Sequence, residues 1–137
     1  MHVKQIVIAY AATAVVFLAL DAVWLTMMAD RLYRPALGPL LLDKFEIAPA
    51  ALFYLLYITG IVVFAVAPGL VNGRWTTSLQ LGALLGLVAY ATYDLTNQAT
   101  LRNWPWRVTL ADLCWGTFVT GVAAAVACRI TARLAPS

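Results

Sequence analysis

Four long apolar stretches alternate with shorter polar ones along the chain. The apolar stretches cover residues 5–28, 49–67, 77–98 and 109–130. Each is close to the roughly 20 residues that a helix needs to cross the hydrocarbon core of a bilayer. The pattern therefore predicts an all-α membrane protein with four transmembrane helices in an antiparallel bundle, and residues 1–137 forming a single integral membrane domain.

Prolines and glycines mark the predicted ends of these helices. The connection 29–48 contains two prolines and a glycine, so we expect no continuous helix there. Its leucines favour a position along the membrane interface, where it could form a lid. The second helix is predicted to end before Pro68. Thr109 and Asp112 fit the pattern of a helix N-cap at the start of the fourth.

Composition supports the membrane class and excludes several others. Hydrophobic residues make up 64% of the chain and charged residues 11%, against about 45–50% and about 25% in soluble domains. The nine Lys and Arg residues lie at the ends of apolar stretches and form no basic stripe, which excludes nucleic acid as a partner. His2 is the sole histidine and the two cysteines lie on one predicted helix, so we predict no metal site, no cofactor and no Ser/His/Asp triad.

Two glycines in the third stretch provide a helix-packing surface. Gly82 and Gly86 lie four residues apart, a spacing that lets two helices approach closely. This surface predicts a homo-oligomer, or docking to a larger membrane complex. Tyr90, Asp94 and Asn97 continue the same helix face.

Polar side chains are predicted to converge at one membrane face. Because four spans alternate in direction, the end of the first and third and the start of the second and fourth lie on the same side. Asp21 sits inside an apolar helix, where a charge facing lipid costs several kcal/mol, so it should point into the bundle. The candidate site residues are Asp21, Trp24, Tyr54, Tyr90, Asp94, Asn97, Asp112 and Trp115, with Arg34 and Arg102 from the loops.

These residues suggest an acid/base pair beside a ligand site. If Asp21 lies within about 4–6 Å of Asp94 or Asp112, the pair would hold a proton for general acid work or proton relay. We assign the acid/base role to Asp21 and Asp94, and ligand binding to the other candidates. Arg34 or Arg102 would bind an anionic head group.

Each candidate also has a structural interpretation. Asp112 could be the helix cap described above, and Asp94 could form an ion pair with an arginine. Asp21 could be a buried group that accepts hydrogen bonds across the bundle. The tryptophans are typical of anchors at the membrane interface.

Motifs spread over nearly the whole chain carry a resemblance to a known family. They are Val-Val-Phe-Leu-Ala-Leu-Asp21-Ala-Val-Trp24-Leu, Pro49-Ala-Ala-Leu-Phe-Tyr54-Leu-Leu-Tyr57, Gly86-Leu-Val-Ala-Tyr90-Ala-Thr-Tyr-Asp94-Leu-Thr-Asn97, Trp104-Pro105-Trp106 and Asp112-Leu-Cys-Trp115-Gly116-Thr117. With these segments the chain resembles the bacterial membrane protein family called domain of unknown function 2177. The resemblance implies a four-span inner-membrane protein and implies no reaction.

The leading functional hypothesis is a pocket that binds or modifies a membrane lipid head group or a small amphiphile, in a multi-pass protein of the bacterial inner membrane. Two alternatives use the same features: a small proton-coupled transporter, and a non-catalytic accessory subunit of a larger membrane complex. A carrier needs a polar path towards the termini, and beyond Thr13, Thr59 and Thr120 the sequence hardly provides one. Whether the protein is an enzyme is left open by the sequence.

Overall fold

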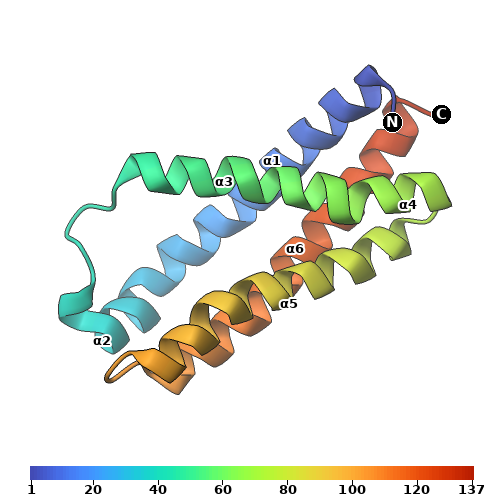
Figure 1. Cartoon of the computed structure of the whole chain (residues 1–137). Helices are drawn as coiled ribbons and strands as arrows, with labels where there is room; N and C mark the ends of the chain where they lie inside the picture. The colour runs from blue at the N-terminus through green and yellow to red at the C-terminus, as the bar shows by residue number, and fades with distance from the viewer.

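The computed structural model describes all 137 residues, and it contains helices and no strands, which confirms the predicted all-α class. The chain forms four long helical units that are connected by short loops (Figure 1). Both termini lie at the same end of the molecule. The units are α1 (Val3–Met28) with η1 (Ala29–Tyr33), α2 (Arg34–Leu37) and η2 (Gly38–Leu40); α3 (Ile47–Ile61) with η3 (Val62–Val66) and α4 (Ala67–Asn72); α5 (Trp75–Thr100); and α6 (Trp106–Leu134).

The first helix passes through a proline instead of ending before it. Residues 29–33 form a π turn, in which the backbone N–H of Arg34 bonds to the carbonyl oxygen of Ala29. Pro35 follows at once, in the first turn of α2. A proline lacks the N–H and crowds the preceding turn, and the wider π turn leaves room for it. The helix therefore continues to Leu37 and breaks at Gly38, whose φ is 48°. The prediction of no continuous helix in 29–48 was wrong up to Leu37 and is confirmed beyond it, since residues 41–46 are not helical.

The second helix passes through its proline in the same way. Residues 62–66 form a π turn, and the N–H of Ala67 bonds to the carbonyl oxygen of Val62, just before Pro68. The helix then continues to Asn72 and ends at Gly73, whose φ of 70° is left-handed. A glycine adopts that conformation without steric cost. The prediction that this helix ends before Pro68 was wrong.

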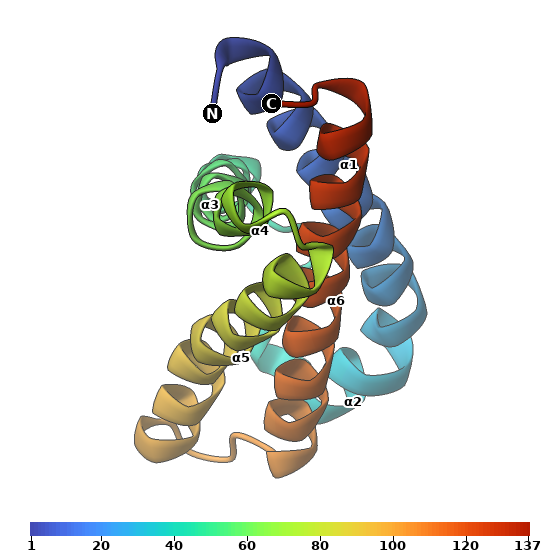
Figure 2. The ribbon, with the colours of Figure 1, turned by 90° about the vertical axis from the view of Figure 1, so that its right-hand side faces the viewer.

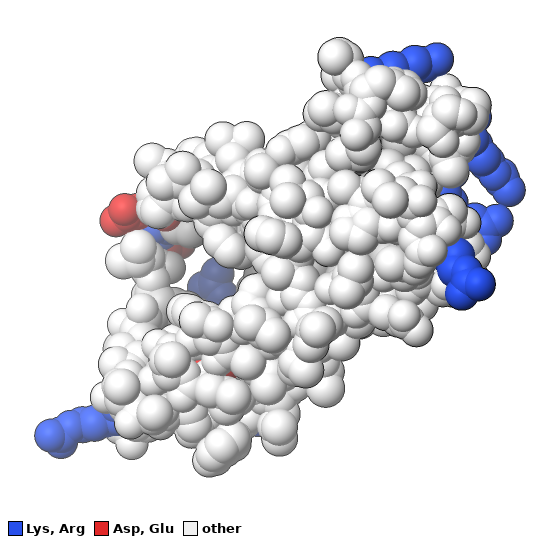
Figure 3. Space-filling model, turned by 45° about the vertical axis from the view of Figure 1, so that its right-hand side comes forward, with Lys and Arg blue, Asp and Glu red and all other residues white.

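Three helical units are long and apolar enough to cross a membrane: Val3–Leu40, Ile47–Asn72 and Trp106–Leu134. With 26 residues α5 is long enough as well. Its threonine, asparagine and glutamine side chains make it less apolar than the candidate spans require. Figure 3 shows charged side chains mainly towards the two ends of the visible face, with an almost uncharged surface between them. The protein is thus a helical membrane protein, and crossing by α5 stays a prediction.

Small residues let α5 and α6 pack side by side (Figures 1 and 2). A Cβ atom added to Gly86 would lie 2.0 Å from the carbonyl oxygen of Gly116, and one added to Gly82 would lie 2.8 Å from the Cβ of Ala124. Only glycine fits such a close approach. The glycine surface predicted to dock a partner is therefore covered by α6 of the same chain, and association with a partner remains a prediction that needs another surface.

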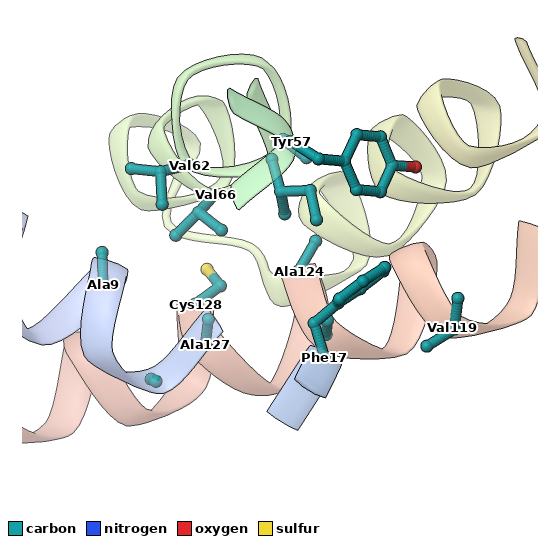
Figure 4. Close-up of a cluster of buried hydrophobic side chains, with 13 residues drawn as sticks. Ala9, Phe17, Tyr57, Val62, Val66, Val119, Ala124, Ala127 and Cys128 are labelled. Atoms are coloured by element: carbon teal, nitrogen blue, oxygen red, sulfur yellow. The ribbon is translucent and has the colours of Figure 1, made fainter. Parts of the chain in front are cut away.

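An apolar core fills the half of the bundle nearer the termini (Figure 4). Phe17, Ile61 and Val119 are completely buried in it. Its polar atoms are few: the hydroxyl groups of Tyr57 and Thr120 are hydrogen-bonded to each other at 2.7 Å. This core separates the terminal end from the polar residues described next.

Candidate functional site

A cavity of about 370 Å³ opens in the other half of the bundle, between α1, α3, α5 and α6. Its walls are mostly aromatic, and it contains no lysine, arginine or histidine. Three of its residues, Leu25, Phe53 and Tyr93, are exposed and form an apolar rim. The residues that line this acidic cavity are Asp21, Trp24, Leu25, Tyr33, Phe53, Tyr54, Ala89, Tyr90, Tyr93, Asp112 and Trp115.

Asp21 accepts hydrogen bonds from two other helices. The Tyr54 hydroxyl on α3 donates to Oδ2 at 2.6 Å, and Nε1 of Trp115 on α6 donates to Oδ1 at 3.1 Å. The carboxylate is only 7% exposed. It points into the bundle as the sequence predicted, and its hydrogen bonds join α1, α3 and α6.

Asp112 is held by a residue from the end of the first helix. The Tyr33 hydroxyl donates a hydrogen bond to Oδ1 of Asp112. Nε1 of Trp24 in turn donates to the Tyr33 oxygen at 2.8 Å. Asp112 therefore forms part of the cavity wall, joined through Tyr33 to α1.

The interpretation of Asp112 as a helix cap was wrong. The helix α6 begins at Trp106, with Pro105 in the N-cap position, so Thr109 and Asp112 already lie inside it. The Thr109 hydroxyl donates to the side chain of Gln98 at 2.8 Å and accepts from the indole of Trp104 at 3.1 Å. Thr109 thus stabilises the turn between α5 and α6 through these side-chain hydrogen bonds, and it does not cap a helix.

Asp94 does not line the cavity. Its side chain is completely buried, and no N–H or hydroxyl group of the protein donates to either oxygen. The charged group that acts on it most strongly is the carboxyl group of Asp112 on α6. Two buried carboxyl groups close to each other repel when both are ionised. The structure therefore pairs Asp94 with Asp112, and not with Asp21 as the sequence suggested.

The two tryptophans of the cavity form a pair. Trp24 follows Asp21 by three residues on α1, and Trp115 follows Asp112 by three residues on α6. Their indole rings are stacked, with centroids 4.6 Å apart and planes 7° apart. Each indole reaches across to the other helix's aspartate, directly or through Tyr33. This repeated Asp-x-x-Trp spacing was a readable signal that the two rings belong to one site, and their role as interface anchors stays a prediction.

The other predicted site residues are dispersed. Tyr90 lines the cavity, with its ring against Gly116. Asn97 does not line it. Arg34 forms an ion pair with Asp30 at 2.9 Å, and Arg102 is exposed at the turn between α5 and α6. Neither arginine lies among the residues of the acidic cavity.

A second cavity, of about 430 Å³, lies next to the first, beneath the end of the first helix and the loop that follows it. It is lined mostly by apolar side chains, among them Leu41, Phe45 and Trp104, and Arg34 lies at its wall. Tyr33 and Asp112 line both cavities, and so form part of the boundary between them.

Tyr33 is the main residue that sequence reasoning missed. It lies in the connection 29–48, for which the prolines and the glycine predict no continuous helix. A regular helix would bring position 32 to the face of Asp21, Leu25 and Met28. The π turn adds one residue, so position 33 takes that place.

Comparison with known proteins places the chain in a family. No curated protein and no solved structure is significantly similar to it. Residues 6–129 match the family described as predicted membrane protein (DUF2177), and this range includes every residue of the acidic cavity. The chain belongs to the DUF2177 family of predicted membrane proteins.

Proposed function

We propose that the protein binds the amine-bearing head group of a small membrane amphiphile in the acidic cavity. The observation that carries this proposal is that two carboxyl groups, Asp21 and Asp112, face an aromatic cavity without a cation. The sole ion pair of the protein joins Arg34 to Asp30 and lies outside that cavity. A buried charge needs a partner, and an ammonium group would supply it.

The aromatic walls favour the same ligand. Faces of tryptophan and tyrosine rings attract cations, and cages of such rings bind quaternary ammonium groups. Trp24, Trp115 and Tyr54 each line the cavity close to one of the two carboxyl groups. An anionic head group would meet like charges here, which argues against the anion site first expected from the loop arginines.

The surroundings suit an amphiphile more than a water-soluble amine. Leu25, Phe53 and Tyr93 give the cavity an apolar rim, which supports entry from the bilayer. The adjoining second cavity is mostly apolar and could take the hydrocarbon part of the ligand. This arrangement presumes that all four helices cross the bacterial inner membrane, as the sequence predicts.

Transport is less well supported by the interior of the bundle. Thr13 is buried without a hydrogen-bond partner, and the Thr59 hydroxyl bonds to the carbonyl of Leu55 in its own helix. The apolar core of Figure 4 fills this part of the bundle. No continuous polar path leads from Asp21 towards the termini.

Modification of the bound head group fits the same geometry, since Asp112 could exchange a proton with it.

The test compares three probes of equal chain length: octylammonium, octanol and octanoate. Each is titrated against the protein in a neutral detergent, and binding is followed by tryptophan fluorescence. We expect octylammonium to bind at least about tenfold more tightly than octanoate. Asp112→Asn should remove most of that preference, because hydrogen bonds to charged groups contribute about 1.5–3 kcal/mol and about 1.4 kcal/mol is a factor of ten.

Asp43→Asn provides the matched control. Asp43 is exposed in the loop before α3 and lines neither cavity, so its loss should leave octylammonium binding unchanged. Equal affinity for octanoate and octylammonium, or an unchanged affinity in Asp112→Asn, would overturn the proposal.

A further inference from the structure

A third cavity, of about 230 Å³, lies at the opposite end of the molecule, where both termini are found. It is formed by α4, the turn into α5 and the last turns of α6. It shares no residue with the acidic cavity or with the second cavity. Its lining residues are Gly69, Leu70, Gly73, Trp75, Cys128, Arg129, Ala132 and Arg133.

Two arginines project from one face of α6 into this region. Arg129 and Arg133 are four residues apart, so their side chains lie one above the other. The guanidinium carbon of Arg129 lies 5.6 Å from the ring centroid of Trp75. This contact with the indole holds Arg129 beside the cavity.

Acidic side chains are absent from this end. Three of the six lie at the far end: Asp30 in η1, and Asp43 and Glu46 in the loop before α3. The other three belong to the group around the acidic cavity, and the sole ion pair is the one between Arg34 and Asp30. Figure 3 shows blue side chains and no red ones at the terminal end of its visible face.

Lys4 and Arg74 add to the positive charge at this end, at the start of α1 and in the turn before α5. With Arg129 and Arg133 they make four cations that have no carboxylate partner among the side chains of the protein. Such a group of cations attracts an anion. The acidic cavity has the opposite charge and lies at the other end of the molecule.

We propose that this terminal cavity binds the phosphate group of an anionic membrane lipid. A guanidinium group can donate two parallel hydrogen bonds to phosphate oxygens. Basic pockets between membrane helices are suited to anionic head groups, and tryptophan side chains favour the interface where those groups lie. Leu70 and Ala132 give the cavity an apolar side for the remainder of the lipid.

Phosphate is the shared chemistry of two sources, a lipid head group and the free ion. The apolar residues beside the arginines favour the lipid, because inorganic phosphate would gain nothing from them. The experiment therefore compares short-chain phosphatidylglycerol, phosphatidylcholine of the same chain length, and inorganic phosphate. Binding is measured by native mass spectrometry of the protein released from a neutral detergent.

The expected result is preferential retention of phosphatidylglycerol by the unaltered protein. In the double variant Arg129→Gln with Arg133→Gln, its affinity should fall by about 30-fold, since each cation near a membrane surface contributes a factor of about five. Inorganic phosphate at equal concentration should displace little of it.

Two exposed arginines at the other end provide the matched control. Arg102→Gln with Arg107→Gln removes the same charge near the turn between α5 and α6, and should leave phosphatidylglycerol binding within about twofold. The proposal is overturned by an equal loss in both double variants, by equal retention of phosphatidylcholine, or by complete displacement with inorganic phosphate. None of these outcomes depends on the amine site, whose test uses different probes and residues.

Discussion

Gly86→Ala is expected to destabilise the protein strongly, although it adds a single methyl group. The new Cβ would lie 2.0 Å from the carbonyl oxygen of Gly116 and 2.8 Å from the Cβ of Thr120. A backbone oxygen cannot rotate away as a side chain can, so α5 and α6 must separate along their main contact. Overpacking of this kind typically costs about 1–3 kcal/mol, and occasionally more. Thermal unfolding in detergent, followed by circular dichroism, measures the effect.

Gly60→Ala is the matched control in another helix. The only atom near a Cβ at position 60 is in the side chain of Phe64, at 3.9 Å. Alanine is also the better helix former by about 1 kcal/mol. The same substitution should therefore stabilise the protein at position 60 and destabilise it at position 86. Equal unfolding temperatures for the two variants would show that the close packing of α5 and α6 does not limit stability.

Trp115→Ala should have the second large effect, on stability and on the site together. It removes the ring that stacks on Trp24 and the N–H that donates to Asp21. Because the side chain is only half-buried, we expect a loss of about 3 kcal/mol, at the lower end for a Trp→Ala change. Octylammonium binding should fall as well, since one wall of the cavity is lost.

Trp115→Phe separates the two contributions. It keeps an aromatic ring beside Trp24 but leaves Oδ1 of Asp21 without its donor, for which about 1–3 kcal/mol is expected. Trp106→Ala is the control, because Trp106 is 60% exposed and lines neither cavity. If Trp106→Ala unfolds as easily as Trp115→Ala, tryptophans stabilise this protein through the detergent or membrane interface and not through the pair.

The fold was predictable to the extent that it depends on apolar runs. All four predicted segments lie inside the four long helical units. The errors fell at Pro35 and Pro68, where the rule that proline ends a helix is a local one. In both places a π turn accommodates the proline, and the local sequence around a proline does not distinguish a helix break from a wider turn.

The site was predictable to the extent that it depends on topology. Alternating helices bring Asp21, Tyr54 and Asp112 to the same half of the bundle, and the structure places all three around one cavity. The predicted pairing of side chains was wrong, because it depends on how each helix is rotated about its own axis. A small rotation moves the side chains by a few ångströms and changes which of them meet. Asp94 faces Asp112, and Tyr33 enters the site through one extra residue in a turn.

The stacked pair of Trp24 and Trp115 also has an optical consequence. Two indoles whose centroids are 4.6 Å apart in nearly parallel planes couple their ultraviolet transitions. A head group that enters between the two aspartates and shifts either ring would change that coupling, and with it the circular dichroism of the aromatic bands. The protein thus carries its own chromophore pair in the cavity wall, and occupancy could be followed without any added label.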